Sequence, residues 1–306
     1  MKRILAFGNP VYDLISTPAY RNEERVLSGC STNACLAVSK LGEKAIMVGT
    51  VGPDYAQQLQ ADLAHYGIEG RLHASAETGG FRLYYYDEHG NRNLSVLGMA
   101  DPIPPQVEDY GAVDFILIGP ILQEIPVALV EQLTARYQAP VMLDPQGLLR
   151  SVKHGEIEHA LTDSFRAIAR MSTIIKANEM ETRIVTGIDP RQDARQAVKA
   201  LYGFGGKIAI TTLAEAGSII YDGEKYYPIP AYATHAIDPT GAGDTYAAGF
   251  MVKYLETPDD LSAAGCFASA VASVMVENIG PEFPLTRPEA DRRAAALMEQ
   301  VSQQHG

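Results

Sequence analysis

STIIKANEMETRIV, residues 172–185, passes directly from a short apolar run into a segment with helical character. The run 172–177 predicts a buried strand, and residues 179–186 predict the helix that follows it. The same unit recurs along the chain. We expect further strands at 4–8, 45–49, 114–119, 141–144 and 207–212, and helices near 32–41, 53–66, 124–137, 155–170 and 191–203. Because short apolar strands alternating with helices form parallel sheets covered on both faces, the sequence predicts an α/β fold with a doubly wound, mainly parallel sheet.

Two stretches interrupt this alternation and predict a small β lid. Residues 12–28 carry Pro18 and a charged RNEER patch where a crossover helix is expected. Residues 72–100 contain the alternation of Phe81, Leu83 and Tyr85 and a DEHGN turn at 87–91, which is typical of a hairpin with one covered face. A lid over one edge of the sheet and a surface hairpin without a binding role fit this pattern equally well. After residue 240 we expect helices at 241–255, 259–278 and 287–303, within a single domain that spans residues 1–306.

Composition and charge narrow the class of protein. The chain is 46% hydrophobic and 20% charged, which predicts a packed core and argues against disorder. A net charge of −12 and the lack of any Lys/Arg block argue against a nucleic-acid partner. The cysteines Cys30, Cys35 and Cys266 form no CxxC pattern, which fits reduced thiols in the cytosol. The apolar run that precedes Gly8 is too short for a signal peptide or a membrane span, so we expect a cytoplasmic protein without a membrane partner.

The stretch DPTGAGDTYAAGF, residues 238–250, combines tiny residues with an aspartate at the start of a predicted helix. In one interpretation Asp244 only complements the helix dipole and Gly241 only permits a turn. In the other, Gly241, Ala242 and Gly243 let free helical N–H groups approach a phosphate, and Asp244 accepts the proton of an attacking hydroxyl. The stretch is neither a Walker loop nor a dinucleotide fingerprint, because no GxxxxGK[ST] occurs and Tyr246 replaces the third glycine.

Small and polar residues also follow several of the predicted strands. Ligands of open α/β sheets bind beyond the carboxyl ends of the strands, which makes these residues candidates for a site. Ordinary turns, helix caps and acidic first turns use the same residue types, so a purely structural role stays open for each. The candidates are Asn9 and Asp13 after the first strand, Gly29 and Asn33 in SGCSTN (28–33), Asn178 and Glu181 in KANEMET (176–182), and Thr212 and Gly217 in TTLAEAG (211–217).

Taken in order, these motifs resemble those of the ribokinase-like (PfkB) family of carbohydrate and nucleoside kinases over nearly the whole chain. The matching pieces are GNPVYD (8–13), the glycine loop up to Asn33, VGTVGPD (48–54), DP (144–145), NEME (178–181), TLAEAG (212–217) and DPTGAGD (238–244). The last is the most specific of them. The resemblance implies a ribokinase-like fold and an ATP-dependent kinase that transfers the γ-phosphoryl group to a hydroxyl of a sugar or cyclitol.

The resemblance also implies a role for each candidate residue. Asp244 matches the general base, and the amides of 241–244 match the anion hole, with Thr240 beside the nucleotide. Asn9, Asp13, Gly29 and Asn33 match the substrate side. Asn178 and Glu181 match the residues that organise Mg²⁺ through water, and Thr212 and Gly217 match nucleotide-flanking positions. Many members use a monovalent cation such as K⁺, and Asp238 stands at the matching position. On family grounds the resemblance also implies a homodimer that pairs through the lid.

Three departures from the family pattern bear on the substrate. Cys30 replaces the second glycine of the usual pair, and Ala214 replaces the glycine common in TLGExG. The short lid carries Tyr84, Tyr85 and Tyr86, whose rings suit either stacking on a ligand or covering the lid's own core. A nucleoside kinase of the same family is therefore the alternative, followed by a non-catalytic sugar-binding or sensing homologue.

Overall fold

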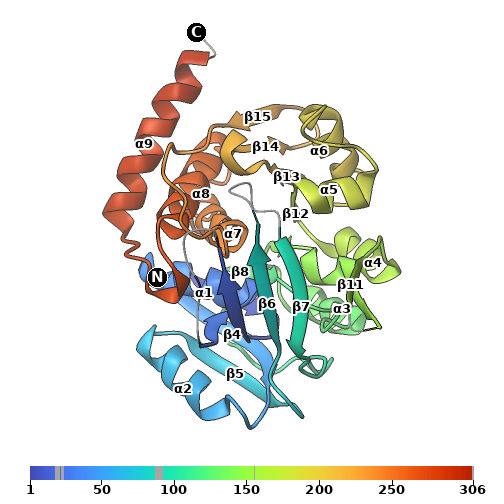
Figure 1. Ribbon diagram of the computed structural model, residues 1–306. Helices are drawn as coiled ribbons and strands as arrows, with labels where there is room; N and C mark the ends of the chain where they lie inside the picture. The colour runs from blue at the N-terminus through green and yellow to red at the C-terminus, as the bar shows by residue number, and fades with distance from the viewer. Residues whose placement is uncertain (18–20, 22–23, 87–91, 155, 305–306) are drawn as a thin grey trace.

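The computed structural model describes residues 1–17, 21, 24–86, 92–154 and 156–304, and a nine-stranded sheet forms the centre of this part of the chain (Figure 1). In order across the sheet its strands are β15 (Tyr226–Ile229), β14 (Ser218–Tyr221), β13 (Ile208–Thr212), β12 (Ile174–Asn178), β9 (Val141–Leu143), β8 (Phe115–Ile118), β1 (Arg3–Phe7), β4 (Lys44–Val51) and β5 (Glu69–Ala74). The pairs from β13 through to β5 are parallel, and β14 and β15 add an antiparallel edge. The predicted α/β fold with a mainly parallel sheet is confirmed.

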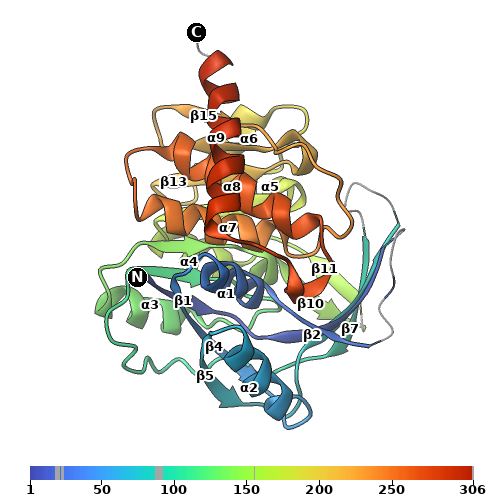
Figure 2. The same ribbon diagram turned by 90° about the vertical axis from the view of Figure 1, so that its left-hand side faces the viewer.

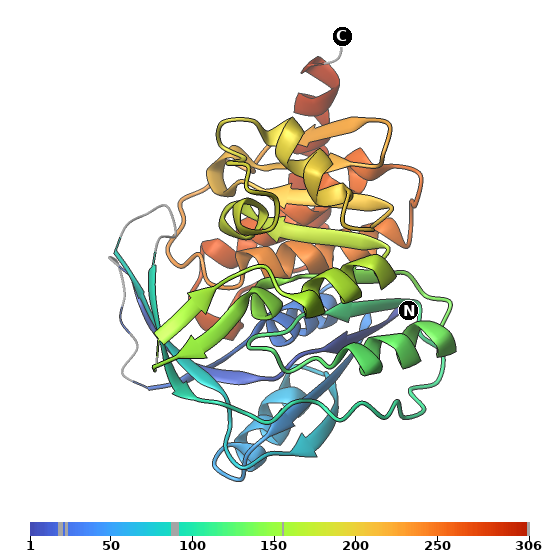
Figure 3. The same ribbon diagram turned by 90° about the vertical axis from the view of Figure 1, so that its right-hand side faces the viewer.

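Helices cover both faces of this sheet because its buried strands are apolar on both sides. In β1, Ile4 and Ala6 pack into one core, while Leu5 and Phe7 pack into the other. The first core lies under the helices that face the viewer in Figure 2, which are α1 (Cys30–Lys40), α2 (Ala56–His65), α7 (Ala242–Tyr254), α8 (Leu261–Val276) and α9 (Arg287–Gln304). The second lies under the helices that face the viewer in Figure 3, which are α3 (Val127–Arg136), α4 (Asp163–Met171), α5 (Glu179–Thr186) and α6 (Ala194–Tyr202).

A second sheet of six strands stands beside the main one, and we call it the lid sheet. Its order is β10 (Arg150–Lys153), β11 (Glu156–His159), β7 (Arg92–Gly98), β6 (Gly80–Tyr85), β2 (Val11–Ser16) and β3 (Val26–Ser28). Figures 2 and 3 show it edge-on at one side of the molecule. Val11 and Ile15 of β2 and Phe81, Leu83 and Tyr85 of β6 form its apolar inner face. Because successive side chains of a strand point to opposite faces, Arg82 and Tyr84 lie on the other, exposed face of this sheet.

The structure corrects two expectations. The helix predicted over 155–170 is wrong in its first part: residue 155 lies outside the described residues, Glu156–His159 form β11, and α4 begins at Asp163 after its cap Thr162. This polar segment becomes a strand only because β11 pairs with both β10 and β7. Residues 72–74, placed in the lid at the sequence level, belong to β5, which pairs with β4. The turn predicted at 87–91 lies outside the described residues.

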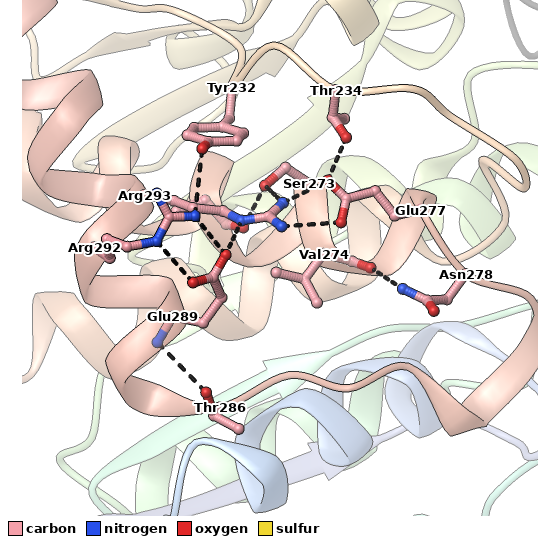
Figure 4. Close-up of polar contacts among 11 residues, drawn as sticks. Tyr232, Thr234, Ser273, Val274, Glu277, Asn278, Thr286, Glu289, Arg292 and Arg293 are labelled. Atoms are coloured by element: carbon pink, nitrogen blue, oxygen red, sulfur yellow. Dashed lines mark hydrogen bonds and ion pairs between the residues drawn. The ribbon is translucent and has the colours of Figure 1, made fainter.

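The C-terminal helix α9 is fastened to α8 by a buried arginine (Figure 4). Arg293 is 8% exposed and donates to Ser273 at 2.9 Å and to both carboxylate oxygens of Glu277 at 2.7 and 2.9 Å. It also donates to Glu289 of its own helix at 2.7 Å. Among the helices of the described residues, none has both the length and the apolar character that crossing a bilayer requires.

Candidate active site

Asp244 lies in the first turn of α7 and does not cap that helix. The helix begins after Gly241, whose φ of 81° is left-handed and therefore favours glycine. The Asp244 carboxylate points across to other elements, because Asn33 Nδ2 of α1 donates to Oδ2 at 2.9 Å and Gln146 Nε2 approaches Oδ1 at 3.4 Å. Gln146 belongs to a short 3₁₀ helix, η1 (Gln146–Leu149). Asp244 lies in the first turn, as the helix-dipole interpretation expects, but that interpretation does not account for its contacts with Asn33 and Gln146.

The small residues before Asp244 give room to two buried polar side chains. A Cβ on Gly241 would lie 3.0 Å from Asn33 Nδ2, and a Cβ on Gly243 would lie 2.8 Å from Lys176 Nζ. Both distances are shorter than ordinary contacts, so a larger residue at either position would displace its neighbour. The tiny residues therefore keep the helix N-terminus close to Asn33 and Lys176.

Three carboxylates and one lysine form a buried charge cluster behind this turn. Lys176, 2% exposed, lies 2.6 Å from Asp144 Oδ2, and Asp144 directly follows β9. Burial, together with the negative charge of Asp144, raises the pKa of Asp244 above its ordinary value, while Lys176 and Asn33 oppose that shift. Burial and Asp144 likewise raise the pKa of Glu181 to about 7.

The substrate-side candidates separate into two groups. Asn33 contacts Asp244, and Gly29, with a φ of 117°, is the N-cap residue before α1. The side chains of Asn9 and Asp13 instead form hydrogen bonds with backbone groups near the lid sheet. Asn9 Nδ2 donates to the Asp101 carbonyl at 3.0 Å and Asn9 Oδ1 accepts from the Thr50 amide at 2.8 Å. Asp13 Oδ1 accepts from the Phe81 amide at 2.7 Å, which joins β2 to β6.

On the opposite side, Asn178 and Glu181 form a capping box at the start of α5. Asn178 Oδ1 accepts from the Glu181 amide, and the Glu181 carboxylate accepts from the Asn178 amide and Nδ2 at 2.9 and 2.8 Å. Thr212 ends β13 in register with Asn178. Gly217 has a φ of 87°, and a Cβ there would lie 2.1 Å from the Ile229 carbonyl oxygen, so only glycine fits.

The loop before α7 is tied to the lid sheet. The Tyr85 hydroxyl lies 2.9 Å from the Thr240 hydroxyl, and both residues are buried. Asp238 is fully buried, and its Oδ1 accepts from the Thr240 amide at 2.9 Å. Of the three lid tyrosines, Tyr85 therefore belongs to the lid's inner face, whereas Tyr84 and Tyr86 are more than half exposed.

Sequence reasoning assigned no role to Glu124, Gln146, Lys176 or the Tyr85 hydroxyl. Glu124 is 3% exposed, and its carboxylate accepts from the amides of Asn9, Ile121 and Leu122 at 2.6–3.0 Å. Lys176 carried a usable signal, because it is a charged residue inside an otherwise apolar strand. The partners of Gln146 and Tyr85 lie 98 and 155 residues away, and no local pattern identifies them.

A pocket of about 320 Å³ opens between the lid sheet and the loops that follow β1 and β8. Its apolar walls include Val11, Phe81, Ile121 and Leu122, and Asn9 and Gln123 supply polar atoms. Val11 also lies against Gly29, at 3.4 Å from where a Cβ on that glycine would stand. The pocket therefore adjoins the glycine loop that carries Asn33.

Comparison with known proteins gives consistent matches over most of the chain. The family described as "pfkB family carbohydrate kinase" matches residues 1–288. A ribokinase from Bacillus subtilis is 29% identical over 95% of this chain and 99% of its own, and a cytidine kinase from Thermococcus kodakarensis is 28% identical over 74% and 78%. A solved pyrophosphate-dependent kinase of the ribokinase family, complexed with a pyrophosphate analog and myo-inositol, has the same fold with a TM-score of 0.79, 23% identity, and coverage of 94% of this chain and 99% of that chain.

Proposed function

Because this chain belongs to the pfkB family of carbohydrate kinases, we propose that it transfers the γ-phosphoryl group of ATP to a hydroxyl of a sugar or cyclitol. The family is one of phosphotransferases, which disfavours the non-catalytic sensor considered from the sequence. The observation that carries the proposal is the setting of Asp244. Its carboxylate is buried in the first turn of α7 and accepts a hydrogen bond from Asn33 at 2.9 Å. It lies next to the backbone amides at the N-terminus of the same helix, where anions bind.

In the proposed reaction, Asp244 accepts the proton of the acceptor hydroxyl. The hydroxyl oxygen forms a bond to the γ-phosphorus while the bond to the bridging oxygen of the donor breaks, and the electron pair leaves with ADP. The amides of Gly241 and Gly243 and the dipole of α7 stabilise the transferring group, whereas the Ala242 amide, expected to be free, donates to the Pro239 carbonyl at 3.2 Å. Asn33 orients the base by fixing Oδ2, while Oδ1, which Gln146 approaches only at 3.4 Å, keeps a lone pair for the proton.

The remaining candidates take positions around this centre in the proposal. Asn9, Asp13 and Gly29 shape the acceptor side, although the side chains of Asn9 and Asp13 act there through the backbone segments that they hold. Thr212, Gly217 and Thr240 flank the nucleotide. Asp238 is the proposed neighbour of a K⁺ ion, and equal rates in potassium and in an organic-cation buffer would contradict that assignment.

Asn178 and Glu181 fit a hydrated Mg²⁺ better than a directly bound one. Each Glu181 oxygen already accepts one hydrogen bond and keeps a further lone pair, which suits contact with a metal-bound water. Mg²⁺ there would neutralise charge on the donor phosphates. The capping box holds the Glu181 carboxylate in a single orientation toward that ion.

A nucleoside is the second candidate acceptor, favoured by the pocket beside Gly29. Its volume of about 320 Å³ lies within the range of about 300–1,000 Å³ that is typical of small-ligand pockets. The apolar wall formed by Val11, Phe81 and Ile121 suits the faces of a planar base, and the polar residues Asn9, Gln123, Glu124 and Ser151 line the rest of the same pocket. The similarity to a cytidine kinase supports the same candidate.

The test is a matrix of donors and acceptors with the purified chain. ATP and pyrophosphate are each combined with pentoses, hexoses, inositols and nucleosides, and the phosphorylated acceptor is detected directly by mass spectrometry. We expect ATP with one acceptor class to dominate. A pyrophosphate preference would contradict the donor, and silence across the matrix would contradict the function. Asp244→Asn should lower kcat by about 10²–10⁴, the usual contribution of a general base, with the melting temperature retained.

We also propose that two copies pair through the exposed face of the lid sheet, which bears Arg82 and Tyr84. Sedimentation of the wild type and of a Tyr84→Glu variant tests this, because a charge at a pairing face should dissociate the dimer. A wild type that sediments as a monomer at micromolar concentration would contradict the proposal.

A further inference from the structure

Lys176 places a buried ammonium group beside the first turn of α7. The residue lies in β12, where its neighbours Ile175 and Ala177 are fully buried apolar side chains. Burying a cation in such surroundings costs several kcal/mol unless a partner compensates it. Asp144 Oδ2 at 2.6 Å is that partner, and Asp144 is itself 1% exposed. An ion pair of this kind adds little net stability compared with apolar residues, so stability alone does not explain it.

The position of the ammonium relative to Gly243 indicates a second role. Nζ and Cε of Lys176 lie 2.8 and 3.7 Å from where a Cβ on Gly243 would stand, and no other described atom outside that helix and its chain neighbours lies within 4 Å of it. The ammonium therefore faces the same turn as the amides of Gly243 and Asp244, which have no intrahelical acceptor at this end of the helix. An anion bound by those amides would lie in contact with Lys176.

Buried carboxylates gather at this turn. Nζ of Lys176 lies 2.6 Å from Asp144 Oδ2, and Asp144, Glu181 and Asp244 are each at most 9% exposed. Because a buried carboxylate without a partner is costly, the charged ammonium is the form of Lys176 that compensates Asp144. A phosphoryl group that approaches Asp244 comes close to the same carboxylates, which repel it. A fixed ammonium at this point offsets that repulsion at the moment of transfer, when charge spreads over the phosphoryl oxygens.

We propose that Lys176 is a further catalytic residue, whose Nζ donates to an oxygen of the transferring phosphoryl group beside Gly243 while Asp144 holds the ammonium in place. The inference rests on the proposed function. The hydroxyl proton still goes to Asp244, and the electron pair of the broken P–O bond leaves with the donor. Lys176 remains protonated throughout and carries no group itself.

Lys176→Met removes the charge and keeps most of the side-chain length, but it leaves Asp144 unpaired and is expected to destabilise the fold. The double variant Asp144→Asn/Lys176→Met removes both charges, so its melting temperature should return toward that of the wild type. We expect kcat of the double variant to stay about 10²–10³ below the wild type, the loss typical of one fixed donor to a developing charge. Asp144→Asn alone keeps the ammonium and should lose about tenfold or less. The exposed Lys225→Met is the matched control and should behave as the wild type.

A second readout separates contact with phosphate from a structural role. ADP with fluoroaluminate mimics the transferring phosphoryl group, and its affinity in the presence of the best acceptor is measured by calorimetry. The wild type and Lys225→Met should bind it much more tightly than ADP alone, whereas the double variant should bind the two equally. A double variant with wild-type kcat, or with the same tightening, overturns this inference alone. A wild type without kinase activity overturns the proposed function and this inference with it.

Discussion

Tyr85→Phe is predicted to slow the reaction by separating the lid sheet from the loop before α7. The substitution removes only the hydroxyl that lies 2.9 Å from the Thr240 hydroxyl. Tyr85 is 2% exposed and Thr240 is 9% exposed, so water does not readily replace the lost partner. A buried neutral hydrogen bond contributes about 0.5–1.5 kcal/mol, and leaving its partner unsatisfied adds to the loss. Because about 1.4 kcal/mol corresponds to a tenfold change in rate, kcat/KM should fall by about three- to tenfold.

The matched controls lie next to it in the chain. Tyr84→Phe and Tyr86→Phe remove hydroxyls from side chains that are 54% and 58% exposed, so neither should change kcat/KM. Steady-state kinetics of the three variants, with the melting temperature of each, provide the measurement. Should Tyr85→Phe match the two controls, the hydroxyl contact would have no part in forming the site. Equal losses in all three variants would instead indicate a general effect on the lid.

Three further predictions concern separate parts of the molecule. Burial and Asp144 raise the pKa of Asp244 above its ordinary value of 3.8. As the pH is lowered, the protonated, inactive form should therefore build up, and kcat should fall, before the pH reaches 3.8. A kcat that falls only below pH 3.8 would contradict the role of Asp244 as the base. Ala214 has a φ of 47°, a left-handed conformation that costs a non-glycine residue about 1–2 kcal/mol. Glycine removes this cost but adds entropy to the unfolded chain, so Ala214→Gly should raise the free energy of unfolding in urea by at most about 1 kcal/mol or leave it unchanged. Arg293→Met should lower the free energy of unfolding by about 1–3 kcal/mol, a loss limited by water because its carboxylate partners are about 30% exposed. The control Arg292→Met lies on the exposed side of the same helix and should leave the urea midpoint unchanged.

The main sheet was predictable because its strands are locally distinctive. The runs around Ile4, Ile116 and Ile174 are apolar on both faces, and that pattern identifies buried parallel strands wherever they pair. The edge strand β5 was missed for the opposite reason. Its residues are mostly exposed or half-buried, and it is a strand because it continues the ladder from β4.

The site was predictable only where a single short motif carries it. DPTGAGD identifies the turn that presents Asp244, and the pairing of Asn178 with Glu181 fits a capping-box pattern of two residues three positions apart. The contacts of Asn33 with Asp244, and of Tyr85 with Thr240, join residues 211 and 155 positions apart. Such pairs depend on how the two sheets meet, which no window of sequence contains.

The lid sheet is assembled from three pairs of strands that lie far apart in the chain, namely β2 with β3, β6 with β7, and β10 with β11, and β2 and β6 pair in parallel. It therefore cannot be exchanged as one continuous segment. Exchanging it for the lid of a relative requires three coordinated grafts, and trimming any one of them leaves an unpaired edge on each strand that it paired with. Its pairings close large loops, so they should form after the parallel core during refolding. Acceptor recognition would then appear last as the protein refolds, later than any signal from the main sheet.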